Sequence, residues 1–209
     1  MSTLGRIPPK RRSGTERFRS GTEPYAATLT AFWAWSVSDL VSNATRGRLA
    51  EFIVAQALGI ATDGVRDECA AFDLETSDHL RVEVKSAAFV QSWHQERLSA
   101  VSFSVKARRA WDPDTNKLAK TASRQADVYV FALVVHKDKA TIDPVDLDQW
   151  RFYVLPTKLL NERKRSQESI MLKSLDRLTG GPVTFAELGR AVRAAAPATA
   201  TDVGGSRTR

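Results

Sequence analysis

The 209-residue chain is 43% hydrophobic, has a formal net charge of +7 and contains one cysteine, Cys69. This length and hydrophobic content suit one domain with a substantial core, and a single cysteine excludes both an internal disulfide framework and a multi-cysteine zinc site. The basic excess lies at residues 1–24 and 190–209, because residues 25–189 contain 21 basic and 21 acidic side chains. The net charge therefore does not by itself establish a polyanionic partner.

The two ends of the chain are predicted to be disordered tails. Residues 1–24 and 197–209 are too poor in apolar side chains to form a core, which leaves one domain at residues 25–196. No apolar run approaches the roughly 18 residues of a membrane span, and the N-terminus lacks an apolar signal-peptide core. A cytoplasmic protein without membrane contact is expected.

Two helices are predicted ahead of the first strand of the domain. Apolar spacing indicates one helix within residues 30–43, where Trp33 and Trp35 are interpreted as packing residues. A second helix is predicted from about Arg46 to Leu58. Glu51 lies beside the apolar stripe of this second helix, so it is either a boundary residue in solvent or directed at a positive charge.

The stretch Ala71–Ser86 predicts two short strands joined by a polar turn. Apolar and charged residues alternate along the second strand, so Glu83 and Lys85 share one face. The Ser77–Asp78 turn folds the first strand back and brings the carboxylate of Asp73 towards Glu83. The sequence therefore predicts a cradle for a divalent metal ion.

The spacing of Asp73 and Glu83-Val84-Lys85 resembles the signature of the PD-(D/E)XK nuclease superfamily. The resemblance covers about residues 46–156, and Phe72 stands where that family usually has proline. It implies an α/β protein with a restriction-endonuclease-like core, in which a central mixed β-sheet is flanked by helices in a single domain.

The resemblance also implies the roles of the site residues. In that superfamily two carboxylates hold Mg²⁺, the lysine orients or activates the attacking water, and an acid on a helix often completes the site. Carried over, Asp73, Glu83 and Glu51 are the expected metal ligands, and the same three residues with Lys85 are the expected catalytic residues. The expected cofactor is Mg²⁺, with Mn²⁺ as a substitute.

Later segments supply the rest of the predicted sheet and its helices. Residues 101–105 alternate as a strand, and residues 126–135 form a nearly uninterrupted apolar run that predicts a central strand covered on both faces. Residues 150–155 predict the next strand, followed by a short helix from Thr157 to about Glu162. A closing helix is predicted from Thr184 to about Ala196, where the sequence has a capping box.

A basic loop is predicted between residues 106 and 124, where six basic residues accompany Trp111. Such a loop is suited to phosphates and an unstacked base, and its alternative is an ordinary solvated surface. The candidate supporting or DNA-binding residues, whose alternative is an ordinary polar surface or sheet-edge role, are Ser86, Gln91, Lys106, Arg108, Arg109 and Gln125.

Other catalytic classes lack their signatures. His79, His94 and His136 are widely spread and form no zinc-binding helix motif, and no GxSxG nucleophile motif occurs. The segment Gly59–Gly64 has the glycine spacing of a phosphate-binding loop but is followed by Val-Arg rather than by Lys and Ser or Thr. A second Glu-x-Lys triplet, Glu162-Arg163-Lys164, lies in a polar helical run without a strand-borne Asp, so no chemistry is expected there.

The expected function is that of a Mg²⁺-dependent endonuclease that hydrolyses DNA phosphodiester bonds. A restriction or defence role is preferred, and repair and junction resolution are also compatible with the resemblance. The alternative is a catalytically inactive protein with the nuclease fold that binds nucleic acid. The expected partners are DNA, with a second copy of the chain and a methyltransferase or a defence or repair protein as further candidates.

Overall fold

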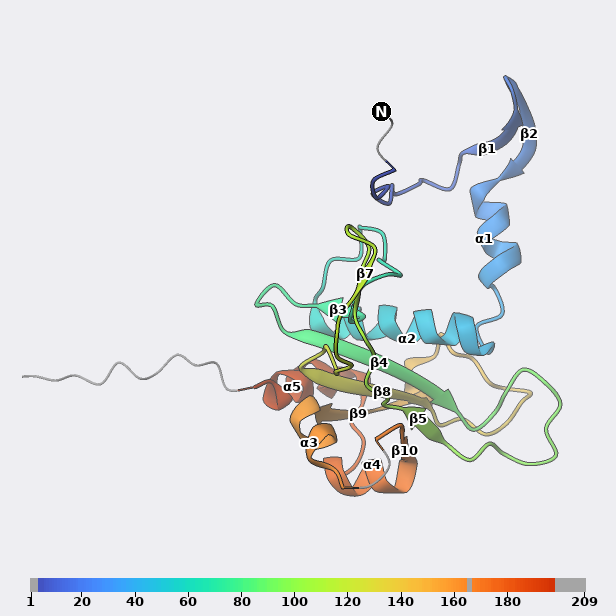
Figure 1. The fold of residues 1–209 in the computed structure, drawn as a ribbon. Helices are drawn as coiled ribbons and strands as arrows, with labels where there is room; N and C mark the ends of the chain where they lie inside the picture. The colour runs from blue at the N-terminus through green and yellow to red at the C-terminus, as the bar shows by residue number, and fades with distance from the viewer. Residues whose placement is uncertain (1–3, 165–166, 198–209) are drawn as a thin grey trace, which may run out of the picture.

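The computed structural model describes residues 4–164 and 167–197. Its strands are β1 (Arg17–Ser20), β2 (Glu23–Thr28), β3 (Leu74–Glu75), β4 (Arg81–Ala88), β5 (Ser102–Ser104), β6 (Trp111–Asp112), β7 (Lys117–Leu118), β8 (Val128–Val134), β9 (Trp150–Pro156) and β10 (Ser169–Met171). Its helices are α1 (Leu29–Val37), α2 (Asn43–Leu58), the 3₁₀ turn η1 (Leu147–Gln149), α3 (Thr157–Glu162), α4 (Leu172–Thr179) and α5 (Phe185–Ala195). Figure 1 shows their arrangement around one sheet.

The central sheet has four strands in the order β3-β4-β8-β9. Strands β4 and β8 are parallel, whereas β3 pairs with β4 and β9 pairs with β8 in antiparallel fashion. Every residue of β8 is buried, as expected for an apolar strand covered on both faces. The predicted mixed sheet in an α/β domain is therefore confirmed.

Helices α2 and α5 cover one face of this sheet, and α4 with β5 and β10 covers the other (Figure 1). Alternate side chains of β4 enter the two cores, since Val82 and Val84 pack with α2 and Ala87 packs with the opposite layer. Glu83 and Lys85 accordingly belong to the face away from α2. The close approach of the two covering helices requires Gly189 in α5, because a Cβ there would lie 2.6 Å from the carbonyl oxygen of Ala57.

Helix α2 begins three residues earlier than the sequence predicts. Ser42 caps it by accepting a hydrogen bond from the backbone N–H of Thr45, and the helix ends at Gly59, whose φ of 67° is in the left-handed region. At the other end of the domain, Thr184 and Glu187 form the predicted capping box of α5.

Part of the predicted N-terminal tail, residues 17–24, takes part in regular secondary structure. Residues 17–28 form an antiparallel hairpin, and together with α1 the hairpin extends away from the sheet (Figure 1). No residue of α1 is buried, and 84% of Trp35 is exposed. The interpretation of Trp35 as a packing residue is therefore wrong within this chain. Trp33 is 39% exposed, so its side chain is only partly covered.

Residues 198–209, which make up most of the predicted C-terminal tail, lie outside the described residues. Within the described ranges, none of the helices has the length and apolar character needed to cross a bilayer.

Candidate active site

The hairpin of β3 and β4 brings Asp73 beside Glu83. Leu74 pairs with Val82 in the antiparallel register, and one further step of that register sets Asp73 opposite Glu83. The Oδ2 atom of Asp73 accepts a hydrogen bond of 2.8 Å from the backbone N–H of Val84. This bond fixes the Asp73 carboxylate to the strand that carries Glu83.

The polar turn between the two strands is held by its own side chains. The backbone N–H of Leu80 donates to Oγ1 of Thr76 over 3.0 Å, and that hydroxyl donates to Asp78 over 2.5 Å. His79 adopts a positive φ of 63°, which closes the turn. The local sequence thus determines the hairpin on which the candidate carboxylates meet.

Glu83 and Lys85 contact each other on one face of β4, as the alternation pattern predicts. The Nζ atom of Lys85 donates a hydrogen bond to Oε1 of Glu83. Both side chains are largely buried, with 18% of Glu83 and 30% of Lys85 exposed. The ion pair therefore lies in a partly desolvated environment, where charge interactions are stronger than in bulk water.

The carboxyl group of Glu83 has a raised pKa. Burial is the main cause, and the negative charge of Asp73 acts in the same direction. The positive charges of Lys85 and Arg108 oppose this effect without cancelling it. Two carboxylates are thus crowded together, and an additional cation between them would favour their ionised forms.

The raised pKa of Glu83 predicts a pH-dependent cost in stability. The stabilisation associated with this group is fully present below its unfolded-state pKa of about 4.3 and is lost as the pH rises through the higher folded-state value. In buffer without divalent ions, Glu83→Gln should therefore have a larger free energy of unfolding than the wild type at pH 7, and the difference should shrink towards pH 4. Urea denaturation across this pH range measures it, and a difference independent of pH would contradict the prediction.

A cavity of about 280 Å³ opens above the Glu83–Lys85 pair. The predicted residues that line it are Glu83, Lys85, Lys106, Arg108 and Gln125, and further lining residues are Ala71, Ser104, Ser123, Arg124 and Tyr129. Apart from Glu83 its charged lining is cationic, which suits a phosphate-bearing ligand. We call this cavity the active-site cavity.

The loop that lines the active-site cavity is pinned to the domain by Arg124. Its guanidinium donates to the carbonyl oxygen of Val105 over 2.8 Å and to Oδ1 of Asn161 over 2.6 Å. Arg109 lies in the same loop but does not line the cavity, and its Nε donates to the carbonyl oxygen of Ala119 over 2.5 Å. The loop is therefore more ordered than its polar sequence suggests.

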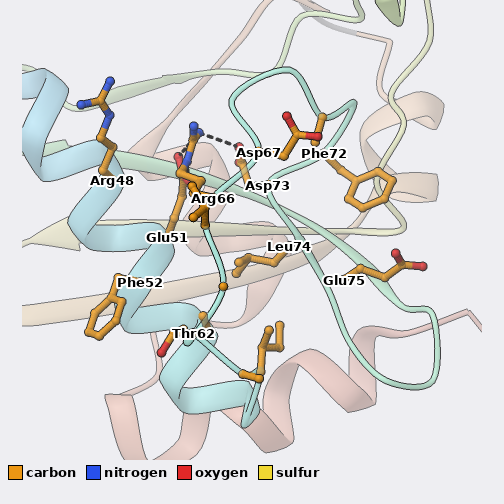
Figure 2. A pocket seen from close by; sticks show the side chains of 16 residues that line it. Arg48, Glu51, Phe52, Thr62, Arg66, Asp67, Phe72, Asp73, Leu74 and Glu75 are labelled. Atoms are coloured by element: carbon orange, nitrogen blue, oxygen red, sulfur yellow. Dashed lines mark hydrogen bonds and ion pairs between the residues drawn. The ribbon is translucent and has the colours of Figure 1, made fainter. Parts of the chain in front are cut away.

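Glu51 approaches Asp73 from α2, across a guanidinium. Arg66 donates to both carboxylate oxygens of Glu51, with Nη2 to Oε1 at 3.0 Å, and the same Nη2 lies 3.8 Å from Oδ1 of Asp73. Figure 2 shows Arg66 between the two acids at a cavity of about 430 Å³. Glu51 is therefore directed at a positive charge, as one of the two predicted alternatives has it, and Arg66 supplies that charge.

The residues present fit a hard divalent cation at Asp73 and Glu83. These two carboxylates are adjacent, and carboxylate oxygens are the ligands that Mg²⁺ prefers. Glu51 is held by Arg66 in this structure, and in the part of the chain that is described no group of three or more His, Cys, Asp or Glu side chains has the arrangement of a metal site. The role of Glu51 as a third ligand stays a prediction.

A protein-family model matches this chain over residues 23–174, and that model describes bacteriophage T4 endonuclease IV. The chain belongs to the bacteriophage T4 endonuclease IV family. No sequence among curated proteins matches it. Membership supports the prediction of a nuclease, and it does not assign the chain to the PD-(D/E)XK superfamily in particular.

The segment matched by the T4 endonuclease IV family contains every predicted site residue, but not all of them meet in one place. Ser86 and Gln91 line a third cavity, separate from that of Glu83 and Lys85 and from that of Glu51 and Arg66.

Two residues near the site of this family member have no signature in the sequence that predicts their positions. Arg66 lies in an irregular loop, and only the folded chain brings it to Glu51 and Asp73. Tyr129 was part of the predicted core strand, yet the parallel register sets it opposite Glu83, whose charge adds to burial in raising the pKa of Tyr129 to about 12. The one hydroxyl-bearing side chain in the apolar run of β8 could have identified Tyr129, whereas no local pattern identifies Arg66.

Proposed function

We propose that this member of the T4 endonuclease IV family is a divalent-metal-dependent endonuclease that hydrolyses DNA phosphodiester bonds in its active-site cavity. One observation carries the proposal: Glu83 and Lys85 line a cationic cavity, with the Asp73 carboxylate fixed to the same strand beside Glu83, inside the segment that matches an endonuclease family. The family name supplies the reaction class, and the side chains supply the means to perform it.

Each residue has a distinct task in this proposal. Asp73 and Glu83 would hold the metal ion, and Lys106 and Arg108 would attract the negatively charged strand towards the cavity. Lys85 offers three N–H donors to the attacking water or to a phosphate oxygen, and its contact with Glu83 keeps it beside the reacting group. When bound, Mg²⁺ would lower the pKa of a water molecule and place positive charge at the phosphate.

Cleavage of circular DNA tests the proposal. The full-length protein should convert supercoiled double-stranded or circular single-stranded DNA to nicked or linear products with Mg²⁺ or Mn²⁺, and EDTA should abolish the conversion. Comparing the two substrates also identifies the preferred strand state. Cleavage that persists in EDTA would overturn the metal requirement, and DNA retention without cleavage under any condition would support the non-catalytic binding protein instead.

The biological role is a separate proposal. The resemblance allows restriction or defence, repair and junction resolution; we favour restriction or defence, for which a neighbouring methyltransferase would be the natural partner. Cleavage of unmodified double-stranded DNA at defined sites, blocked when both strands of those sites are methylated, would support restriction, whereas cleavage that requires a lesion, a mismatch or a junction would support repair or junction resolution.

A further inference from the structure

A third cavity, of about 250 Å³, lies where the N-terminus of α2 meets the end of β4. Its polar lining residues are Asn43, Arg46, Ser86, Gln91, Ser99 and Ser102. These residues provide hydroxyl groups, amides and one guanidinium, and the lining contains no carboxylate. We call it the Arg46 cavity.

Within the described part of the chain, Arg46 is a buried cation that is paired only with neutral groups. It is 4% exposed, and its guanidinium donates to the carbonyl oxygen of Val41 over 3.1 Å, to Oδ1 of Asn43 over 2.6 Å and to Oε1 of Gln91 over 3.4 Å. Its Nε is buried and has no hydrogen-bond partner among the described residues. Burial lowers the pKa of Arg46, and no neighbouring carboxylate raises it.

This arrangement is costly unless an anion completes it. An arginine keeps its charge inside a protein, and a buried charge is normally paired with an opposite charge. The lining groups around Arg46 are the kinds that bind phosphate oxygens, namely a guanidinium, hydroxyl groups and amide N–H groups. A phosphate group therefore matches both the charge and the hydrogen-bonding capacity of the Arg46 cavity.

The Arg46 cavity adjoins the active-site cavity. Ser102 lines the former and Ser104 lines the latter, and the two side chains lie on the same face of β5, about 6.6 Å apart along the strand. Likewise, Lys85 and Ala87 lie two residues apart on one face of β4, and they line the active-site cavity and the Arg46 cavity respectively. One extended strand could therefore reach both cavities.

We infer that the Arg46 cavity binds a second backbone phosphate of the substrate strand, next to the phosphate at Glu83 and Lys85. This inference rests on the proposed function for the identity of the strand, but the phosphate site itself does not. Its effect would be to fix the register of the strand over the catalytic groups.

Inorganic phosphate tests the site without any cleavage. In the full-length protein, phosphate should raise the melting temperature in a saturable way relative to sodium chloride at equal ionic strength. Gln91→Glu should abolish this rise, because Oε1 of Gln91 already accepts from Arg46 and a carboxylate there would replace the anion. The control is Gln56→Glu, the same substitution on the exposed side of α2, outside the Arg46 cavity, which should retain the rise.

A second variant keeps the test decisive if Gln91→Glu does not fold. Ser102→Asp places a carboxylate in the same cavity from an exposed position on β5 and should also abolish the rise. The proposal of a phosphate site would be wrong if phosphate still raised the melting temperature of every folded cavity variant. It would also be wrong if phosphate did not raise the melting temperature of the wild type.

Oligonucleotide binding in EDTA then distinguishes a backbone phosphate from free phosphate. Gln91→Glu should lower the slope of log K against log salt by about 0.7 for a single strand, the value of one phosphate contact. Replacing one phosphate of the oligonucleotide at a time by an uncharged methylphosphonate locates the contact. At one position the replacement should weaken binding to the wild type and leave the affinity of Gln91→Glu unchanged. If only inorganic phosphate responds, the strand assignment is wrong. If phosphate and strand both bind while no DNA is cleaved, the nuclease proposal fails and the phosphate site stands.

Discussion

Lys85→Met is expected to lower the rate of metal-dependent DNA cleavage by about 10²- to 10⁴-fold, the range typical for loss of a positioned proton-transfer group. The substitution keeps the aliphatic length of the side chain but removes the N–H donors that contact Glu83 and face the active-site cavity. Initial rates on circular DNA at saturating Mg²⁺ measure the effect. Glu83→Gln should reduce the rate comparably, because it removes one of the two adjacent carboxylates.

The chain contains its own control for this experiment. Glu162 and Lys164 repeat the Glu-x-Lys triplet at the end of α3, where neither residue lines the active-site cavity. Lys164→Met and Glu162→Gln should therefore leave cleavage within about twofold of the wild type. Full activity in Lys85→Met, or equal losses at positions 85 and 164, would remove the basis for placing the chemistry at Glu83 and Lys85.

Phe131→Ala is expected to lower the free energy of unfolding by about 3–5 kcal/mol. Phe131 is fully buried in the layer between the sheet and α4, and its ring lies 5.1 Å from that of Phe103 in an edge-to-face contact. It is also the residue of β8 directly opposite Lys85 in the parallel register. Chemical denaturation monitored by fluorescence gives the change directly.

Two variants show whether burial is the cause. Phe131→Leu keeps most of the volume and should cost much less than Phe131→Ala. Phe52→Ala removes a phenyl ring that is 51% exposed on α2, so it should change stability by roughly 0.5 kcal/mol or less. Similar losses at positions 52 and 131 would contradict the description of the core.

Local patterns predicted the framework of the fold well. The apolar run of β8, the alternation that puts Glu83 and Lys85 on one face and the capping box at Thr184 each depend on residues that are neighbours in the sequence. The structure confirms these three features. The hairpin of residues 17–28 was missed because its strands remain exposed and therefore show no burial pattern.

Features that depend on distant contacts could not be predicted in the same way. Arg66 acquires its role from Glu51, fifteen residues earlier in the chain, and Arg46 is buried against Gln91, forty-five residues later. Nothing in the flanking sequence of either arginine distinguishes it from a solvated surface residue. Strand β10 and helix α4 also went unpredicted, although Leu175 of α4 is a fully buried core residue.

Because β3 is short, the Asp73 carboxylate has a second, structural role: it satisfies a backbone N–H group on the open edge of the sheet. Strand β3 pairs only with residues 81–82 of β4, and beyond them the N–H of Val84 is satisfied by the Asp73 carboxylate. An alanine at position 73 would leave that N–H without its acceptor and offer the bare edge to another chain, a common route to aggregation. Asparagine retains an oxygen for the N–H while removing the charge, so it separates the loss of a metal ligand from damage to the sheet.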